Sequence, residues 1–301
     1  MKRLMLSTSA WLMLSTVNDA HAHTQAAIDA GRGPVSLLIP DGYVADTPVP
    51  LIVSLHGFGG SGDSYIQYWE KNGLVDTKGF IVAAPTGTTN SKGRAFWNAS
   101  AACCDKDRSG IDDSSYIRSV IEAVQAAYTI DPKSIHVTGY SNGGFMAHRM
   151  ACDHPDLVAS IAAVAGASRT EEQSCNPKQS AHILHIHGTA DTVIRYEGGK
   201  LKNYTSDVRV PHPGAEESVQ FWARLNGAQP VEVNAPMMDL SHRTPGPDTS
   251  VLRYERSSPF PVTIELWSIS GETHVPKMTQ AFHTQSTDWM LSHRKASQEA
   301  E

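Results

Sequence analysis

The sequence predicts an α/β fold in which a mainly parallel β-sheet is covered by helices on both faces. Short apolar segments of strand length alternate with segments of helical periodicity, which is the pattern of repeated β-α units. Several short segments are apolar at nearly every position, as is typical of parallel strands buried on both faces. The sequence has 301 residues, shows no internal repeat, and is predicted to form one domain over residues 23–301.

The expected strands are short apolar runs, several of which end in glycine-containing turns. The first, 35–39, is expected at an edge of the sheet, after a loose leader over residues 23–33. The others follow in chain order at 50–56, 80–85, 134–138, 157–164, 182–188, 251–254 and 262–267.

The expected helices lie between these strands, at 61–72, 117–128, from the turn at residue 141 to Pro155, at 215–225 and at 278–291. In the second, apolar residues recur at i, i+3, i+4, i+7 and i+11 from Ile117 to Tyr128, which predicts an amphipathic helix. Asp112 and Asp113 stand before it and are predicted to cap its N-terminus.

The first 22 residues have the features of a secretory signal peptide. Lys2 and Arg3 precede a mostly apolar segment, and Ala-His-Ala at 20–22 fits a cleavage site. Cleavage there makes His23 the first residue of the mature chain. We therefore expect a secreted protein, periplasmic or extracellular. No later run is long and apolar enough to predict a membrane helix.

The chain contains four cysteines, Cys103, Cys104, Cys152 and Cys175. An even number in an exported protein suggests two disulfide bonds, for which three pairings exist. A bond between the neighbours Cys103 and Cys104 would be strained, so each is expected to pair with one of the other two. Zinc is the alternative, but paired CxxC and HExxH motifs are both missing, and no metal site is predicted.

The most informative motif lies in a turn between an expected strand and an expected helix. Gly139-Tyr140-Ser141-Asn142-Gly143 fits G-x-S-x-G, the pattern of a nucleophile elbow. Side chains on the flanking glycines would obstruct so sharp a corner. The Asn142 N–H, at a helix N-terminus, is predicted to face a developing oxyanion. Tyr140 is predicted to contact the substrate.

A second glycine-rich turn, His56-Gly57-Phe58-Gly59-Gly60, follows the expected strand 50–56. A buried strand ending in such a turn is typical of the other half of an oxyanion hole, and the Phe58 N–H is the predicted donor. His56 is expected to orient this loop. Trp97, in the long loop 86–110, is predicted to line a substrate cleft, and packing beneath the loop is the alternative.

A serine nucleophile needs a base, and the base needs an orienting partner. With a nucleophile elbow these follow in the order Ser, Asp or Glu, His. Asp191 and His274 each lie just beyond an expected strand, where groups collect at the carboxyl edge of a parallel sheet. Ser141, Asp191 and His274 are therefore the predicted nucleophile, orienting carboxylate and base.

Other histidines are weaker candidates for the base. His283 falls within the expected closing helix, and His212 and His242 fall in turn-rich connectors. His185 and His187 share one face of an expected strand, which leaves metal ligation open, but no third ligand is in view.

Together these motifs resemble the secreted poly(3-hydroxybutyrate) depolymerase-like esterases, which overlap the feruloyl and acetylxylan esterases of carbohydrate esterase family one. The resemblance extends over residues 35–291 and rests on segments 56–60, 97–113, 139–144 and 187–191. It implies an α/β-hydrolase fold, hydrolysis of carboxylic esters by Ser141, Asp191 and His274, and no cofactor.

Two departures from the family bear on the substrate. Phe58 stands where many polymer depolymerases have cysteine, and Val275-Pro276 follows His274 in place of a common Trp-Pro step. The chain also lacks a Ser/Thr-rich linker and an added substrate-binding domain. We therefore expect feruloyl or acetyl esters on plant polysaccharide. A depolymerase of poly(3-hydroxybutyrate) or a related polyester is the alternative.

The net charge of −6 with no basic stripe argues against a nucleic-acid partner, and the sequence predicts no oligomeric state. Two other functions are alternatives: a binding module on a hydrolase scaffold, and a copper enzyme that uses His23 as its N-terminus. The Ser, Asp and His set argues against the first, and the α/β pattern argues against the second.

Overall fold

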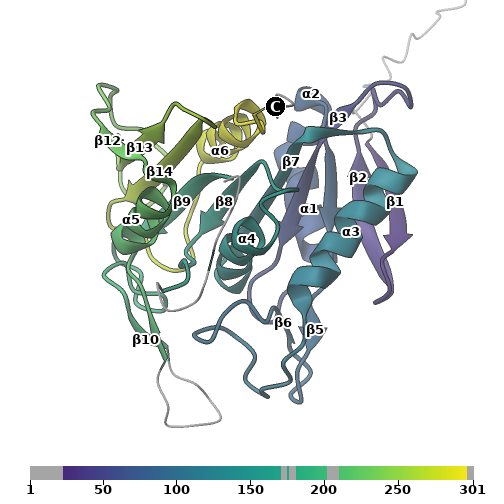
Figure 1. Cartoon of the computed structure of the whole chain (residues 1–301), viewed down its shortest axis with the longest axis horizontal. Coiled ribbons are helices and arrows are strands. Elements are labelled where there is room, and N and C mark those ends of the chain that lie inside the picture. Colours follow the sequence, from purple (N-terminus) through teal and green to yellow (C-terminus); the bar gives the residue numbers. More distant parts are fainter. Residues whose placement is uncertain (1–22, 171–174, 176–180, 202–209, 297–301) are drawn as a thin grey trace, which may run out of the picture.

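A computed structural model of the chain describes residues 23–170, 175, 181–201 and 210–296 (Figure 1). The expected signal peptide, residues 1–22, lies outside the described residues. Within those ranges, no helix combines the length and the apolar character that crossing a lipid bilayer requires.

The fold is built on a ten-stranded sheet with a parallel centre. Its strands in spatial order are β1 (Thr24–Asp29), β2 (Pro34–Ile39), β4 (Ile81–Ala84), β3 (Val49–Leu55), β7 (Ile130–Tyr140), β8 (Ser160–Val164), β9 (His182–Gly188), β14 (Val262–Ile269), β13 (Thr249–Arg256) and β12 (Gln229–Val231). The six strands from β4 to β14 are parallel, and the outer strands on both sides pair antiparallel. This confirms the predicted fold class.

Two short hairpins stand outside the sheet. One pairs β5 (Thr88–Thr89) with β6 (Ala95–Phe96), and the other pairs β10 (Gly199–Leu201) with β11 (Val210–His212). The first hairpin lies within the long loop 86–110, so that loop has structure of its own.

Helices cover both faces of the sheet, as predicted. On one face, α3 (Asp113–Ala127), α4 (Asn142–Asp153) and α5 (Ala215–Asn226) share an apolar core with the strands. On the other, α1 (Gly62–Asn72), α2 (Leu74–Lys78) and α6 (Gln280–Ser292) form a second core (Figure 1). The central strands are therefore buried on both faces of the sheet, which explains their continuous apolar sequences.

The prediction of a loose leader over residues 23–33 is wrong. These residues contain β1, which pairs antiparallel with β2 from Thr24↔Ile39 to Asp29↔Pro34. Strand β2 is therefore covered on both sides and is not an edge strand. The side chains of β1 are exposed or half-buried, so the strand forms by backbone pairing and leaves little apolar alternation in the sequence.

Only one of the two aspartates at the start of α3 caps the helix. Asp112 accepts from the Ser115 N–H, as a cap does. Asp113 is fully buried, forms an ion pair with Arg32 and accepts from the Asn98 N–H. Asp113 therefore ties the long loop and the N-terminal hairpin to the start of α3, which corrects the prediction that both residues are caps.

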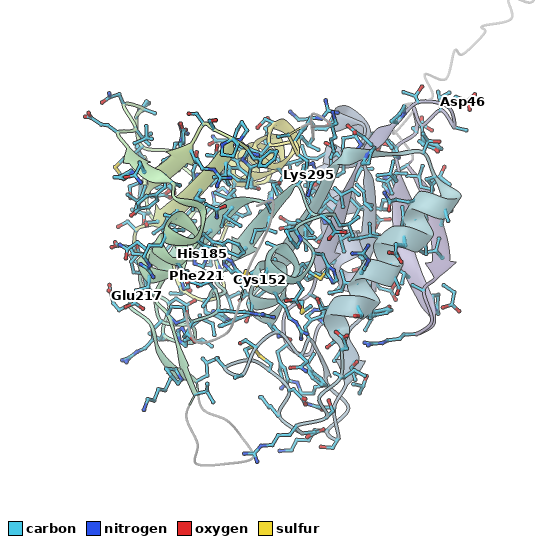
Figure 2. All side chains as sticks on the ribbon, viewed as in Figure 1. Asp46, Cys152, His185, Glu217, Phe221 and Lys295 are labelled. Atoms are coloured by element: carbon cyan, nitrogen blue, oxygen red, sulfur yellow. A yellow bond between two sulfur atoms is a disulfide. The ribbon has the colours of Figure 1, made fainter. Side chains whose placement is uncertain are left out.

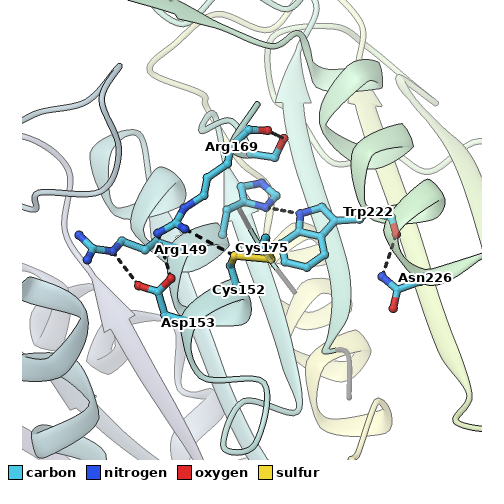
Figure 3. The surroundings of a disulfide bond; sticks show 9 residues. Arg149, Cys152, Asp153, Arg169, Cys175, Trp222 and Asn226 are labelled. Atoms are coloured by element: carbon cyan, nitrogen blue, oxygen red, sulfur yellow. Dashed lines mark hydrogen bonds and ion pairs between the residues drawn. A yellow bond between two sulfur atoms is a disulfide. The ribbon is translucent and has the colours of Figure 1, made fainter. Parts of the chain in front are cut away.

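The predicted disulfide pairing is wrong as well. The structure pairs Cys103 with Cys104, and it pairs Cys152 with Cys175, as Figure 3 shows. Cys103 lies against Asn142 at the start of α4, with a 3.4 Å contact from Asn142 Nδ2 to the sulfur. Cys152 lies ten residues further along the same helix, about 15 Å away at 1.5 Å per residue. No disulfide spans that distance.

The Cys152–Cys175 bond should carry most of the disulfide stabilisation. It closes a loop with a sequence separation of 23, for which unfolded-chain entropy predicts about 3 kcal/mol. We expect the double variant Cys152→Ser/Cys175→Ser to lower the free energy of unfolding by about that amount in urea denaturation. The matched control, Cys103→Ser/Cys104→Ser, opens a bond between neighbours and should lower it far less. Equal losses in the two variants would contradict this expectation.

A buried histidine on β7 should make stability depend on pH. His136 is fully buried between the hydroxyls of Ser160, at 2.8 Å, and Ser134, at 3.2 Å. Burial lowers its pKa from 6.5 to about 3. Below pH 6.5 the unfolded chain therefore binds a proton that the folded protein does not.

The free energy of unfolding should consequently fall as the pH drops, by about 2 kcal/mol at pH 5 for this one group. Urea denaturation at pH 7.5 and pH 5 measures this loss, and His136→Gln should reduce it. An identical pH dependence in the variant would show that His136 makes no contribution.

Candidate active site

Ser141 stands at a strained corner between β7 and α4. Its φ of 55° and ψ of −117° lie outside the regions that side-chain-bearing residues prefer. The corner exists because backbones approach closely at both flanking glycines. A Cβ on Gly139 would lie 2.3 Å from the Gly143 oxygen, and one on Gly143 would lie 2.1 Å from the Leu55 oxygen. Neither position can take another residue without moving the backbone.

Ser141, His274 and Asp191 form one hydrogen-bonded row. His274 Nε2 lies 3.0 Å from Ser141 Oγ, and His274 Nδ1 lies 2.7 Å from Asp191 Oδ2. Because a carboxylate only accepts, Nδ1 carries the ring proton and Nε2 is free to accept from the serine hydroxyl. The structure thus brings together the three residues that chain order predicted. Among the described histidines, only His274 bonds to Ser141.

Two neighbouring loops carry Asp191 and His274. Strands β9 and β14 are parallel with Gly188 beside Ile269, so the loops that follow them leave the same edge of the sheet. The loops also bond to each other, from the Ala190 N–H to the Glu272 carbonyl oxygen at 2.9 Å. This direct contact fixes the spacing between the Asp191 and His274 backbones.

Asp191 is held as a carboxylate. Burial alone would raise the pKa of this group, but hydrogen bonds from His187, His274 and the Val193 N–H bring the pKa well below its usual range. Its Oδ1 accepts from the Val193 and Ile194 N–H groups at 2.8 and 2.9 Å. Asp191 is thus ionised at neutral pH and held in one orientation, as a partner for an imidazolium must be.

Glu272 anchors the loop that carries His274, and the sequence pattern did not reveal it. Its carboxylate is fully buried and binds Arg243 Nε at 2.7 Å. The same carboxylate accepts from the Ser241 hydroxyl and the Lys277 N–H, at 3.1 and 2.8 Å. Arg243 lies far away in the chain, within a turn-rich connector, so nothing in the local sequence marks this pair.

Tyr140 contacts the loop of His274 through both its hydroxyl and its ring. Its hydroxyl donates to the His274 carbonyl oxygen, and its ring centre lies 5.3 Å from the imidazole. Burial raises the pKa of Tyr140 to about 12, so the phenol keeps the proton that it donates. Tyr140 therefore holds the backbone of His274, and its predicted contact with substrate stays a prediction.

The glycine-rich turn after β3 is fixed by His56. The buried imidazole accepts from the Gly87 N–H at 2.9 Å and contacts the Gly57 oxygen at 2.7 Å. Within the turn, the Gly59 N–H donates to the Ala95 oxygen. Within the described part of the chain, neither the Phe58 nor the Asn142 N–H has a hydrogen-bond acceptor. Their roles as oxyanion donors stay predictions.

Trp97 does not line a substrate cleft, which corrects its predicted role. Its side chain has no exposed surface, and its indole N–H donates to the His56 oxygen at 2.9 Å. Its backbone N–H and carbonyl both pair with the Asn142 side chain at 2.8 Å. Trp97 is a packing anchor that joins the long loop to the glycine-rich turn and the elbow helix.

A cavity of about 640 Å³ lies between the sheet, α1 and α6. Its walls include Tyr140 and Val275, the chain neighbours of Ser141 and His274, together with Tyr65, Trp69 and Phe282. Val275 is 72% exposed, so this part of the cavity wall is open to solvent. In the described ranges, no three His, Cys, Asp or Glu residues are placed to hold a metal ion.

Known proteins with similar sequences and structures include several esterases. The chain is 29% identical over 196 residues to feruloyl esterase B of Piromyces equi, covering 64% of this chain and 35% of that protein. It is 28% identical over 227 residues to the putative esterase NocK of Nocardia uniformis, covering 70% of this chain and 62% of that protein. The chain thus spans less than two thirds of either relative.

The acetyl xylan esterase structure from Aspergillus awamori superposes with a TM-score of 0.59 at 17% identity, covering 89% of this chain and 98% of that one. At this identity the likeness shows the fold alone. The profile of the phospholipase/carboxylesterase family matches residues 44–210, more than half of the 301 residues. The chain belongs to the phospholipase/carboxylesterase family.

Proposed function

We propose that the protein hydrolyses carboxylic esters through an acyl-enzyme on Ser141. The observation that carries this proposal is the row of Ser141, His274 and Asp191 on a strained elbow, with hydrogen-bond distances of 3.0 and 2.7 Å. A non-catalytic binding module would not need these three side chains in one hydrogen-bonded row. The family to which the chain belongs is described as phospholipase/carboxylesterase. The proposal assigns Ser141 as nucleophile, His274 as base and Asp191 as orienting carboxylate.

In the first half of the reaction, Ser141 Oγ attacks the ester carbonyl while His274 Nε2 takes its proton. Asp191 stabilises the resulting imidazolium through the Nδ1 hydrogen bond. The tetrahedral oxyanion is held by the Phe58 and Asn142 N–H groups, which have no acceptor in the described part of the chain. His274 then gives its proton to the leaving alcohol, and water hydrolyses the acyl-enzyme by the same route.

For the substrate, we favour feruloyl or acetyl esters on plant polysaccharide. The cavity beside Tyr140 and Val275 supports the larger, aromatic acyl group, because its volume of about 640 Å³ is in the range of small-molecule pockets and its walls are largely aromatic and aliphatic. An acetyl group would leave nearly all of this space empty.

We also propose that the protein is secreted, with residues 1–22 removed and residues 23–301 forming one catalytic domain. The charge and the cleavage pattern of the first residues support export. Two disulfide bonds fit an oxidising compartment.

Loss of the Ser141 hydroxyl should abolish turnover. In Ser141→Ala, kcat for 4-nitrophenyl acetate should fall by about 10⁴-fold or more, because the acyl-enzyme cannot form. The control, Ser134→Ala, removes a buried hydroxyl from the middle of β7 and should keep wild-type kcat. Retained activity in Ser141→Ala would refute the assignment of the nucleophile.

The acyl preference should depend on the open rim at Val275. We expect wild-type protein to prefer methyl ferulate over methyl acetate in kcat/KM, and Val275→Trp to lower this preference at least several-fold by covering the cavity mouth. Val44→Trp is the control, since Val44 is also exposed, at 59%, and does not line the cavity. A wild-type preference for acetate would contradict the aromatic assignment. Faster hydrolysis of hydroxybutyrate oligomers than of either ester would favour the polyester alternative.

A further inference from the structure

A row of buried side chains leads from α5 through the core to Asp191. The indole N–H of Trp222, on α5 (Figure 3), donates to His148 Nδ1 at 3.0 Å. His148 Nε2, on α4, lies 3.0 Å from His185 Nδ1. His185 Nε2 in turn lies 3.1 Å from His187 Nδ1, both residues being on β9. All four side chains are at most 1% exposed, and His185, on β9, is seen near α5 in the view of Figure 2.

The two ends of this row fix the position of every proton in it. An indole N–H only donates, so His148 must accept at Nδ1 and carry its hydrogen on Nε2. By the same reasoning, His185 and then His187 each accept at Nδ1 and carry the hydrogen on Nε2. At the far end, His187 Nε2 lies 2.8 Å from the Ile194 carbonyl oxygen, which only accepts. Both ends therefore require the same tautomer, neutral with the hydrogen on Nε2, in all three histidines.

A second proton has no place in this row. A protonated imidazole donates from both nitrogens, so two N–H groups would face each other across about 3 Å. Burial acts in the same direction, since it lowers the pKa of His148 to about 3 and that of His185 well below its usual value. Among the described residues, the other titratable groups that face the row are Tyr196, edge-on to His187, with His212 and Asp191.

The last N–H of the row points at the turn that holds the orienting carboxylate. His187 Nε2 lies 3.4 Å from Asp191 Oδ2, the oxygen that binds His274. The carbonyl that His187 binds belongs to Ile194, whose own N–H holds Asp191 Oδ1 at 2.9 Å. His187 thus contacts Asp191 Oδ2 directly, and it is linked to Asp191 Oδ1 through the Ile194 peptide.

We infer that Trp222, His148, His185 and His187 form a proton-ordered positioning array for Asp191, in which the indole N–H at one end and the Ile194 carbonyl at the other set the tautomer of three histidines in series. The array ends in a donor aimed at the carboxylate and at the turn around it. This inference rests on the proposed function, because Asp191 orients the base there. The four residues are positioning residues, since none of them touches the reacting atoms.

The direct test is ¹⁵N NMR of the histidine side chains, assigned with single-histidine variants. We expect His148 and His185 to be neutral with the hydrogen on Nε2 at every pH between about 5 and 8, where an ordinary histidine titrates, and we expect His187 to carry a hydrogen on Nε2. Titration of His148 or His185 in this range, or a neutral Nδ1–H tautomer in any of the three, would overturn the array.

A second test removes the donor at the head of the row. Trp222→Phe keeps an aromatic ring but has no N–H, so one of the two constraints on the tautomers is lost, and the Nδ1–H form should become populated at His148, next to the lost donor. Activity should show kcat falling by about 10-fold with KM within twofold, as expected for misplacement of a catalytic group. The matched control is Trp267→Phe, which loses a buried indole hydrogen bond to Glu265 of 2.7 Å outside the row. It should change neither the tautomers nor kcat.

A third pair of variants separates hydrogen bonding from packing. Glutamine carries one acceptor and one donor, as neutral imidazole does, so His148→Gln should keep most of kcat. His148→Leu fills space without either group and should match Trp222→Phe. Equal kcat in the Gln and Leu variants, or an unchanged kcat in Trp222→Phe, would overturn the positioning role. A wild-type protein with the expected tautomers but no ester hydrolysis would instead refute the proposed function.

Discussion

The site depends on the backbone of Ser141, which is held at a φ of 55° and a ψ of −117°. A side-chain-bearing residue in this region costs about 1–3 kcal/mol, and the surrounding structure must offset that cost. It does so through close backbone contacts at Gly139 and Gly143 and through the bond from the Ser141 N–H to the Val164 oxygen. The parallel centre of the sheet thus holds the hydroxyl of Ser141 at the edge of the sheet.

The other two members of the row follow from the same topology. Strands β7, β9 and β14 all end at one edge of the sheet, and Ser141, Asp191 and His274 come directly or shortly after them. Buried polar groups then fix the loops that carry Asp191 and His274, whose conformations the sheet topology does not determine. Glu272 ties down the loop of His274, and His187 backs the turn of Asp191. The site is therefore rigid because its supports are buried hydrogen-bonded groups, for which losing a partner is costly.

Sequence reasoning succeeded where local pattern and chain order carry the information, and it failed where distant residues meet. The elbow glycines, the strand ends before Asp191 and His274, and the helices on both faces are all visible in short windows. The partners of Asp113, Glu272 and Cys152 are not, because each lies far away in the chain. The pairing of His148 with His185 was hidden for the same reason, and the depth of Trp97 depends on how the loop folds back on Asn142.

The central claim is that His274, aligned by Asp191, makes the Ser141 oxygen a nucleophile. Reaction with a fluorophosphonate, followed by peptide mapping with mass spectrometry, tests this claim most directly. We predict one adduct per chain, on Ser141, formed much more slowly when His274 is replaced by alanine. An adduct on another serine, or ester hydrolysis that persists with Ser141 unmodified, would contradict it.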